Sequence, residues 1–98
     1  MDFRVSVLLS MQRALWDLVT PNLRGVAIRI APVRVEARFL LENEPTDEDL
    51  ENISEAETAM MADVRNDVAV SFTASWVPNS LPRDLEQSEE WVYLRKES

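Results

Sequence analysis

The fold is decided by a stretch in the first half of the chain, LRGVAIRIAPVRVEARFLLE (residues 23–42). Apolar side chains occupy nearly every second position, both before and after Ala31 and Pro32. Such period-two alternation is typical of strands that bury one face. Proline cannot donate a hydrogen bond to a strand ladder, so the break at Pro32 suits a turn. We therefore predict a β-hairpin over residues 23–42.

The residues before the hairpin show helical periodicity. Residues 5–19 are apolar in most directions, and Pro21 ends the predicted helix because the residue before a proline avoids the helical region. Arg13 and Asp17 have the i,i+4 spacing of a helical ion pair. Trp16 is expected in the core. The one polar stripe of this helix consists of Ser6, Ser10, Arg13 and Asp17.

A second helix follows the hairpin. Thr46 suits the N-cap position, and acidic residues fill the first turn, where the helix dipole favours negative charge. We expect this helix to end near Arg65 and Asn66. Its apolar stripe consists of Leu50, Ile53, Ala56, Met60, Met61 and Val64.

Two further strands complete the predicted fold. Residues 68–77 alternate like the hairpin, residues 78–90 have the composition of a loop, and residues 91–95 form a short terminal strand. The order α-β-β-α-β-β predicts an α+β fold with one domain, residues 1–98. We expect a two-layer sandwich, in which a four-stranded, mainly antiparallel sheet carries both helices on one face. The far face, left open, would present Ala27, Arg29, Arg34, Glu36, Arg38, Ser71 and Thr73.

Composition narrows the range of functions. The 98 residues include no Cys, no His and a single Gly, so the chain lacks a thiol nucleophile, the commonest general base and metal ligand, and a glycine-rich phosphate-binding loop. We therefore predict no enzyme activity, metal, cofactor or small-molecule substrate. The net charge of −8 argues against direct binding of nucleic acid, which needs a basic surface. Neither a membrane span of ~20 apolar residues nor a signal peptide is recognisable, so we expect a cytoplasmic protein.

The acidic charge is concentrated in one part of the chain. Residues 1–41 carry six Arg against three acids, a net charge of +3, whereas residues 42–98 carry four basic and fifteen acidic residues, a net charge of −11. Residues 42–63 contain nine acids and no basic residue. Like charges at i,i+4 repel by a few tenths of a kcal/mol. The stretch is either a solvated helix face or a surface that steers a basic partner.

Two acidic clusters supply the candidate partner-binding residues. The first lies on the outer side of the second helix, and the second precedes the last strand. Trp91, next to the second cluster, is a candidate apolar anchor because Trp and Tyr are enriched in binding hot spots. Trp91 and Tyr93 fit the core equally well. The candidate site consists of Asp47, Glu48, Glu51, Glu55, Glu86, Glu89, Glu90 and Trp91.

Three other patterns carry less weight. The start of the second helix resembles a calcium loop, but Asn52 replaces the glycine of that loop and Thr58 its last acid. Glu89 and Glu90 are neighbouring carboxylates, and adjacent residues do not converge on one substrate. Arginines on an open sheet face suggest RNA binding, but that mode needs aromatic side chains on the same face. Pairing of these arginines with Glu36 explains them better.

Three segments resemble a family of small acidic bacterial proteins: VSVLLSMQRAL (5–15), VTPNLR (19–24) and EPTDED (44–49). The family comprises immunity proteins of contact-dependent growth inhibition systems, and the likeness covers about half of the chain. The resemblance implies a cytoplasmic protein that binds and neutralises the toxin domain of a cognate effector, often a nuclease. Contact residues differ between toxin–immunity pairs, so none is carried over.

We therefore predict an immunity protein that occludes the basic active-site cleft of a cognate toxin, a nuclease, with its acidic surface. The alternative is an acidic chaperone or adaptor for a secreted effector, which binds without inhibiting. A further rival is an enzyme that uses only Asp, Glu, Arg or Tyr. Such an enzyme would need two carboxylates that face each other across a cleft.

Overall fold

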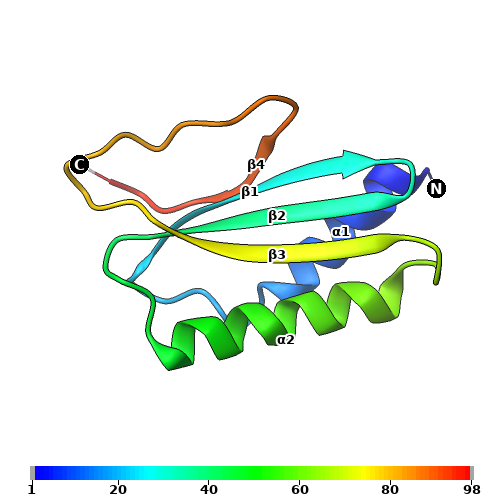
Figure 1. The fold of residues 1–98 in the computed structure, drawn as a ribbon, viewed down its shortest axis with the longest axis horizontal. Coiled ribbons are helices and arrows are strands. Elements are labelled where there is room, and N and C mark those ends of the chain that lie inside the picture. The colour runs from blue at the N-terminus through cyan, green and yellow to red at the C-terminus, as the bar shows by residue number, and fades with distance from the viewer. Residues whose placement is uncertain (1, 98) are drawn as a thin grey trace.

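The structure, a computed structural model, describes residues 2–97 and contains two helices and four strands in that range (Figure 1). The order of the elements, α-β-β-α-β-β, confirms the predicted order and the α+β class. The elements are α1 (Phe3–Ala14), β1 (Leu23–Ala31), β2 (Arg34–Leu41), α2 (Asp47–Asp63), β3 (Ala69–Trp76) and β4 (Glu90–Leu94).

The predicted hairpin forms the centre of the sheet. β1 and β2 pair antiparallel around a two-residue turn at Pro32 and Val33, and β1 pairs antiparallel with β4 on its other side. β3 lies beside β2 and runs parallel to it, so the strand order is β3-β2-β1-β4. The sheet is therefore mixed. The reason is that α2 carries the chain back to the starting end of β2 before β3 begins, as parallel pairing requires.

α1 is shorter at its C-terminal end than the sequence suggests. Asp2 caps the helix by accepting a hydrogen bond from the backbone N–H of Val5 at 2.8 Å. The helix ends at Ala14, five residues before the predicted end, and Asp17 adopts a left-handed conformation with φ 67°. Asp tolerates this conformation better than most residues. The turn leaves Trp16 70% exposed, so the expectation that Trp16 lies in the core is wrong.

Polar contacts join the two helices. The sequence predicts that Arg13 pairs with Asp17. Within residues 2–97, Arg13 pairs with Asp63 at 3.2 Å instead. The Asp63 carboxylate also accepts a hydrogen bond at 2.6 Å from the hydroxyl of Ser10, which is 3% exposed. The Ser10 hydrogen bond lowers the pKa of the Asp63 carboxyl. Ser10 therefore belongs to the contact between the helices, and the predicted polar stripe of α1 is interrupted.

α2 begins where the sequence predicts. The Thr46 hydroxyl accepts a hydrogen bond from the backbone N–H of Asp49 at 3.1 Å, and the Asp49 carboxylate accepts one from the backbone N–H of Thr46 at 3.0 Å. This reciprocal capping box satisfies two backbone donors at the start of the helix. The helix ends at Asp63, shortly before the predicted end at Arg65.

Both helices contribute buried side chains to one hydrophobic core with the sheet. Met11 of α1, Met60 of α2 and Ile28 of β1 are each 0% exposed. Burial of such a side chain contributes roughly 1.5–3 kcal/mol. Two members of the predicted apolar stripe of α2 are not buried, since Leu50 is 50% exposed and Met61 is 56% exposed. The buried stripe of α2 is therefore narrower than its apolar pattern indicates.

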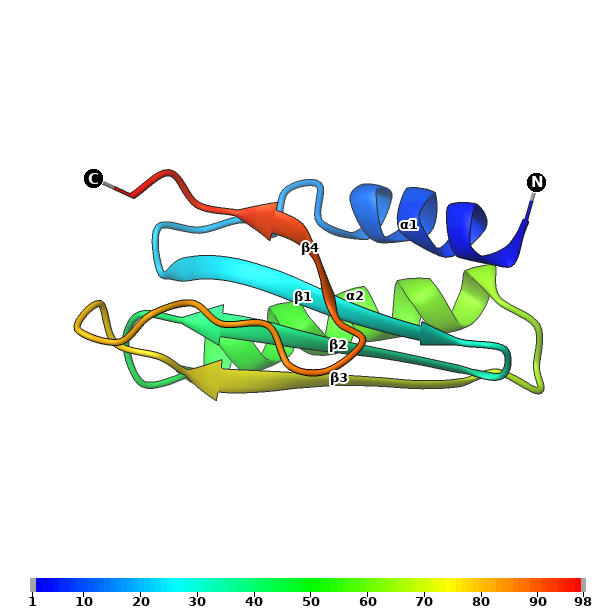
Figure 2. The ribbon, with the colours of Figure 1, turned by 90° about the horizontal axis from the view of Figure 1, so that it is seen from above.

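The sheet face opposite α2 is partly covered, and the expectation of an open face is wrong only in part. Ala27 is buried and Arg29, Glu36 and Arg38 are half-buried, whereas Arg34, Ser71 and Thr73 are exposed. The segment 77–89 crosses this face, in front of the strands in the view of Figure 2, whereas α2 lies behind them. The Arg29 guanidinium donates to the Gln87 carbonyl at 2.9 Å, and the Arg38 guanidinium donates to the Asp84 carbonyl at 2.9 Å. Strand periodicity carries no information about such a cover, because the covering segment is itself irregular.

Candidate protein-binding surface

The acids of α2 and two acids of the second predicted cluster, Glu86 and Glu89, lie on opposite faces of the sheet. We call the first cluster, on α2, the helix acids: Asp47, Glu48, Glu51 and Glu55. We call the second cluster, at the end of the crossing segment and the start of β4, the loop acids: Glu86, Glu89 and Glu90. Because α2 lies behind the strands and the crossing segment lies in front of them (Figure 2), one flat partner surface cannot contact the helix acids together with Glu86 and Glu89.

The helix acids are exposed and uncompensated. All four residues are exposed to solvent. Helix geometry directs Glu48, Glu51 and Glu55 away from the side of α2 that buries Ile53 and Ala56. Within residues 2–97, none of the four forms an ion pair. Their negative charge is therefore directed to solvent, or to a partner.

Three other acids of α2 serve the fold instead, one of them Asp63 through its contacts with Arg13 and Ser10. Asp49 completes the capping box and also accepts a hydrogen bond from the side-chain amide of Asn22 at 3.1 Å. Glu57 accepts a hydrogen bond at 2.9 Å from the backbone N–H of Phe72 in β3. The acidity of α2 thus divides into carboxylates that hold neighbouring segments and carboxylates that contact no cation.

Arginines of the sheet compensate the loop acids. The Glu89 carboxylate lies 2.8 Å from the Arg38 guanidinium, and its side chain is only 5% exposed. The hydrogen bond from Arg38 holds the pKa of the Glu89 carboxyl below its usual value. Glu86 lies 3.9 Å from both Arg29 and Arg38. The structure therefore places these acids within ion pairs that fasten the crossing segment to the sheet.

The remaining loop acid, Glu90, and the candidate anchor Trp91 also contact the fold. Glu90 pairs with Arg4 of α1. Trp91 is half-buried over Gly25, where an added Cβ would lie 3.0 Å from the indole ring and 3.2 Å from the Tyr93 carbonyl. The single glycine thus makes room for β4 and its indole. Tyr93 packs against the core, so both aromatic residues have structural contacts.

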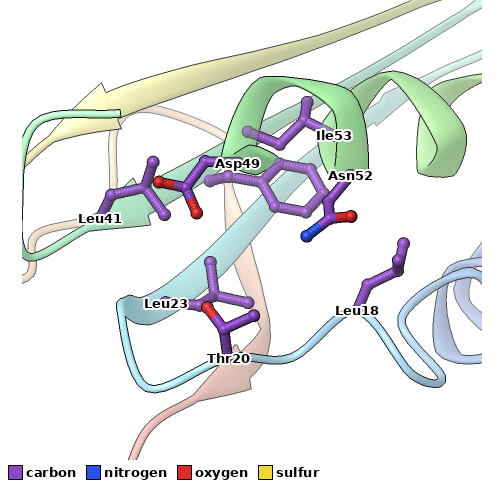
Figure 3. A pocket seen from close by; sticks show the side chains of 8 residues that line it. Leu18, Thr20, Leu23, Leu41, Asp49, Asn52 and Ile53 are labelled. Carbon is purple, nitrogen blue, oxygen red and sulfur yellow. The ribbon is translucent and has the colours of Figure 1, made fainter. Parts of the chain in front are cut away.

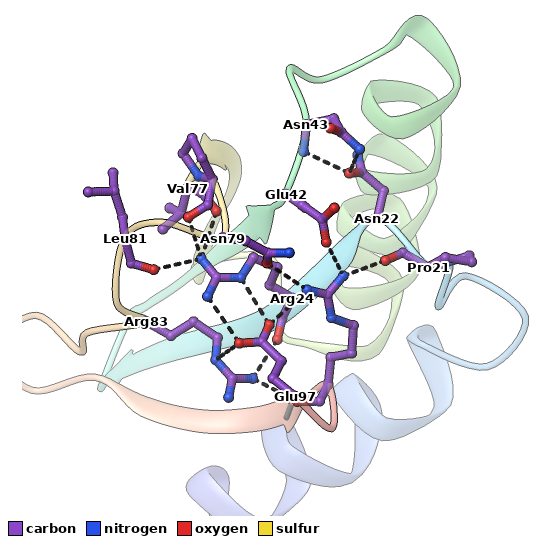
Figure 4. Close-up of polar contacts among 12 residues, drawn as sticks. Pro21, Asn22, Arg24, Glu42, Asn43, Val77, Asn79, Leu81, Arg83 and Glu97 are labelled. Atoms are coloured by element: carbon purple, nitrogen blue, oxygen red, sulfur yellow. Dashed lines mark hydrogen bonds and ion pairs between the residues drawn. The ribbon is translucent and has the colours of Figure 1, made fainter.

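A buried arginine organises the C-terminal end of the chain, and sequence reasoning missed it. Arg24 is 3% exposed, and its guanidinium donates to the carbonyls of Val77, Pro78 and Leu81 at 2.7–3.0 Å (Figure 4). It also donates to both carboxylate oxygens of Glu97 at 3.0 Å. The hydrogen bond from Arg24 lowers the pKa of the Glu97 carboxyl to about 2. The sequence signal for this network is Arg24 itself, a charged residue among the apolar residues at the start of β1.

The sequence as a whole supplies the observation that decides the class of protein. The family model described as MafI2 immunity protein matches residues 4–97. The chain belongs to the MafI2 immunity protein family. No curated protein matches the sequence. The immunity class expected from the sequence resemblance is thereby confirmed, whereas the contact-dependent growth inhibition system stays a prediction.

Membership of the MafI2 family indicates a cognate toxin as the partner and an inhibitory, non-enzymatic role. Within the described residues 2–97, no three side chains of the metal-binding types come together. In the same range, neither helix is long and apolar enough to cross a membrane.

An apolar pocket lies between α2, β1, β2 and the segment before β1. Its volume is about 10 Å³, far below the ~300–1,000 Å³ of typical small-molecule sites. The Asp49 carboxylate at its rim belongs to the capping box of α2. The residues that line this pocket are Leu18, Thr20, Leu23, Phe39, Leu41, Asp49, Asn52 and Ile53 (Figure 3). This pocket is a packing gap at the helix start.

Proposed function

We propose that this MafI2-family chain neutralises a cognate toxin by binding it through the helix acids, and that the toxin is a nuclease whose basic active-site cleft they occupy. A cleft that binds nucleic acid must attract phosphate, so it is lined with Lys and Arg. Four exposed carboxylates along one side of a helix complement such a cleft in charge. We place this encounter in the cytoplasm, where a nuclease toxin meets nucleic acid.

The observation that carries the proposal is the contrast between the two acidic clusters. Arg38 and its neighbours balance the loop acids, whereas no cation within residues 2–97 balances the helix acids. Glu51 and Glu55 are one helical turn apart and repel each other by a few tenths of a kcal/mol. A helix face that served solubility alone would lower this cost by mixing charges. A surface that attracts a basic partner must keep its acids together, and the repulsion between Glu51 and Glu55 follows from that.

The proposal leaves the loop acids and Trp91 outside the contact surface. Glu89 would have to abandon a nearly buried ion pair with Arg38 to reach a partner. Removing one partner of such a pair is strongly destabilising. We therefore assign Glu86 and Glu89 the role of holding the segment 77–89 on the sheet, and Glu90 and Trp91 the role of holding β4 against α1 and β1.

A growth assay tests this function and separates it from the chaperone alternative. Co-expression of the chain with its cognate toxin domain should restore growth of a sensitive bacterium. A chaperone or adaptor would bind the toxin and leave growth arrested, and that result would contradict the proposal.

Charge reversal of Glu51 and Glu55 in the double variant E51K/E55K should weaken the rescue of growth. Both positions lie beyond the first turn, so the helix dipole is not the cause of the effect. The matched control D67K/D84K reverses two exposed acids outside α2 and should rescue growth like the unmodified chain. Equal rescue by both double variants would remove the helix acids from the contact surface.

A further inference from the structure

β3 is an edge strand whose outer side has no neighbouring strand within residues 2–97. The backbone N–H groups of Ala69 and Val77 donate to hairpin carbonyls at 2.9 and 2.8 Å, so the backbone N–H and C=O groups of the odd-numbered residues of β3 point toward β2. Successive residues of a strand direct these groups to opposite sides, and the backbone groups of the even-numbered residues therefore point outward. Phe72 fits this alternation, because its N–H reaches the Glu57 carboxylate of α2 instead of β2. The outward groups of Ala74 and Trp76 have no strand to pair with.

Exposed apolar side chains flank this free edge. Glu57 faces the edge through its hydrogen bond to Phe72. Leu50 and Met61 lie on the same side of the helix as Glu57, at i−7 and i+4, and they are 50% and 56% exposed. Trp76, at the end of β3, is also 56% exposed. α2 and β3 run in opposite directions (Figure 1), so Trp76 and Leu50 lie at the same end of the edge.

The same end of the edge carries unpaired negative charge. By helix geometry, Asp47 lies next to Leu50 at i−3, and Glu51 lies next to Asp47, one turn further on and closer to solvent. Both residues are exposed and belong to the helix acids, which contact no cation within residues 2–97. A polypeptide laid along this part of β3 would therefore have backbone groups to pair with, apolar side chains to cover and carboxylates to neutralise.

We propose that the outer edge of β3 binds an extended segment of the toxin as an added strand. This inference rests on the proposed function and names its mode of binding. The added strand pairs with the Ala74–Trp76 half of β3, because the Glu57 carboxylate already occupies the N–H of Phe72. Main-chain hydrogen bonds supply affinity in such strand addition, and alternate side chains supply specificity. Here the segment directs basic side chains to Asp47 and Glu51 and apolar ones to Leu50.

The charge of α2 argues against a second copy of this chain as the occupant. Pairing of two β3 edges about a twofold axis would place two α2 helices side by side on one face of a continuous sheet. Asp47 and Glu51 of one copy would then approach the helix acids of the other. Like charges brought together at an interface are destabilising. A basic segment of the toxin would instead be attracted to Asp47 and Glu51 beside this edge.

Amide hydrogen exchange, measured by NMR on the labelled chain alone and in complex with its cognate toxin domain, tests the inference. In the complex, exchange at Ala74 and Trp76 should slow by about tenfold or more, because new hydrogen bonds protect these amides. Thr73 and Ser75, whose N–H groups point toward β2, serve as internal controls and should change far less. Unchanged exchange at Ala74 and Trp76 in a complex that forms would overturn strand addition and leave the proposed function standing.

Two further outcomes also decide the question. Failure of the toxin domain to bind at all would overturn the proposed function and this inference together. Protection of Ala74 and Trp76 that grows with the concentration of the chain alone would identify a second copy as the occupant and overturn the inference.

A variant pair gives an independent readout. Ala74→Pro removes one outward N–H, and proline is tolerated at edge positions whose N–H faces solvent. It should weaken toxin binding by about tenfold, whereas Ala74→Ser, which keeps the N–H, should bind like the unmodified chain. Equal affinity of the two variants would contradict strand addition. If Ala74→Pro fails to fold, the exchange measurement on the unmodified chain decides alone.

Discussion

The Glu89 carboxylate lies 2.8 Å from the Arg38 guanidinium, and the two side chains are only 5% and 17% exposed. Their hydrogen bond is the main cause of a lowered pKa at Glu89 and a raised pKa at Arg38. The pair fastens the segment 77–89 to the sheet. An acid that the sequence assigns to a partner-binding cluster thus holds the fold together, and the proposed binding surface is confined to the helix acids of α2.

Glu89→Gln should lower the free energy of unfolding by about 2–3 kcal/mol, because it leaves the Arg38 charge partly buried without its anion. Urea unfolding measures this loss. Glu86→Gln is the matched control, since Glu86 is 62% exposed and 3.9 Å from its partners. Its effect should stay within about 0.5 kcal/mol. Equal losses in the two variants would contradict the anchoring role of Glu89.

Glu55→Lys should stabilise the free chain while weakening its binding to the toxin. The substitution replaces repulsion from Glu51 with an i,i+4 attraction, a gain of roughly 0.5–1 kcal/mol. Thermal unfolding should show a rise in Tm of about 4 °C, and the association rate with the toxin should fall. Asp84→Lys, outside α2, should leave both quantities nearly unchanged. A stabilised variant that binds the toxin at the unmodified rate would contradict the binding role and favour the alternative, that the helix acids are only a solvated helix face.

Arg24→Lys should destabilise the chain by about 3 kcal/mol or more, because an ammonium group cannot replace a planar guanidinium that serves several acceptors at once. Arg24 donates to three carbonyls and to both oxygens of Glu97. Chemical denaturation measures the loss. As a control, Arg65→Lys alters an arginine that is 68% exposed and should cost less than about 0.5 kcal/mol. Similar costs at the two positions would contradict the assigned role of Arg24.

Stability should fall with acidification in a window set by Glu97. Its pKa is about 2 in the folded chain, against an ordinary value of 4.5. The folded state therefore binds fewer protons than the unfolded state in this range. The stabilisation from Glu97 is fully present above pH 4.5 and is lost as the pH falls toward 2. Unfolding measured from pH 6 down to pH 2.5 should show a smaller decline for Glu97→Gln, and an equal decline in both proteins would contradict the assignment.

The hairpin and the start of α2 could be predicted from the sequence because both depend on local rules. The alternation around Pro32 specifies two strands and a turn, and Thr46 with Asp49 specifies a helix start. The end of α1 could not be predicted. Apolar residues continue through Leu18, and only the left-handed conformation of Asp17 turns the chain.

The ion pairs that hold the segment 77–89 and Glu97 against the sheet join residues far apart in the sequence, and they lay beyond prediction for that reason. Arg38 meets Glu89 across 51 positions, and Arg24 meets Glu97 across 73. The same limit applied to the candidate site. Charge alone marks its acidic residues, and charge does not distinguish Glu89, which faces an arginine, from Glu55, which faces solvent.

The association rate with the cognate toxin domain, measured by stopped flow at several salt concentrations, tests the central claim most directly. For the unmodified chain the rate should fall by about tenfold or more between low and high salt. The E51K/E55K variant should associate at least about tenfold more slowly at low salt and depend little on salt. D67K/D84K, with the same change of net charge, should lose less than about threefold. Equal rates for E51K/E55K and the unmodified chain at low salt would contradict the assignment of the helix acids as the toxin-binding surface.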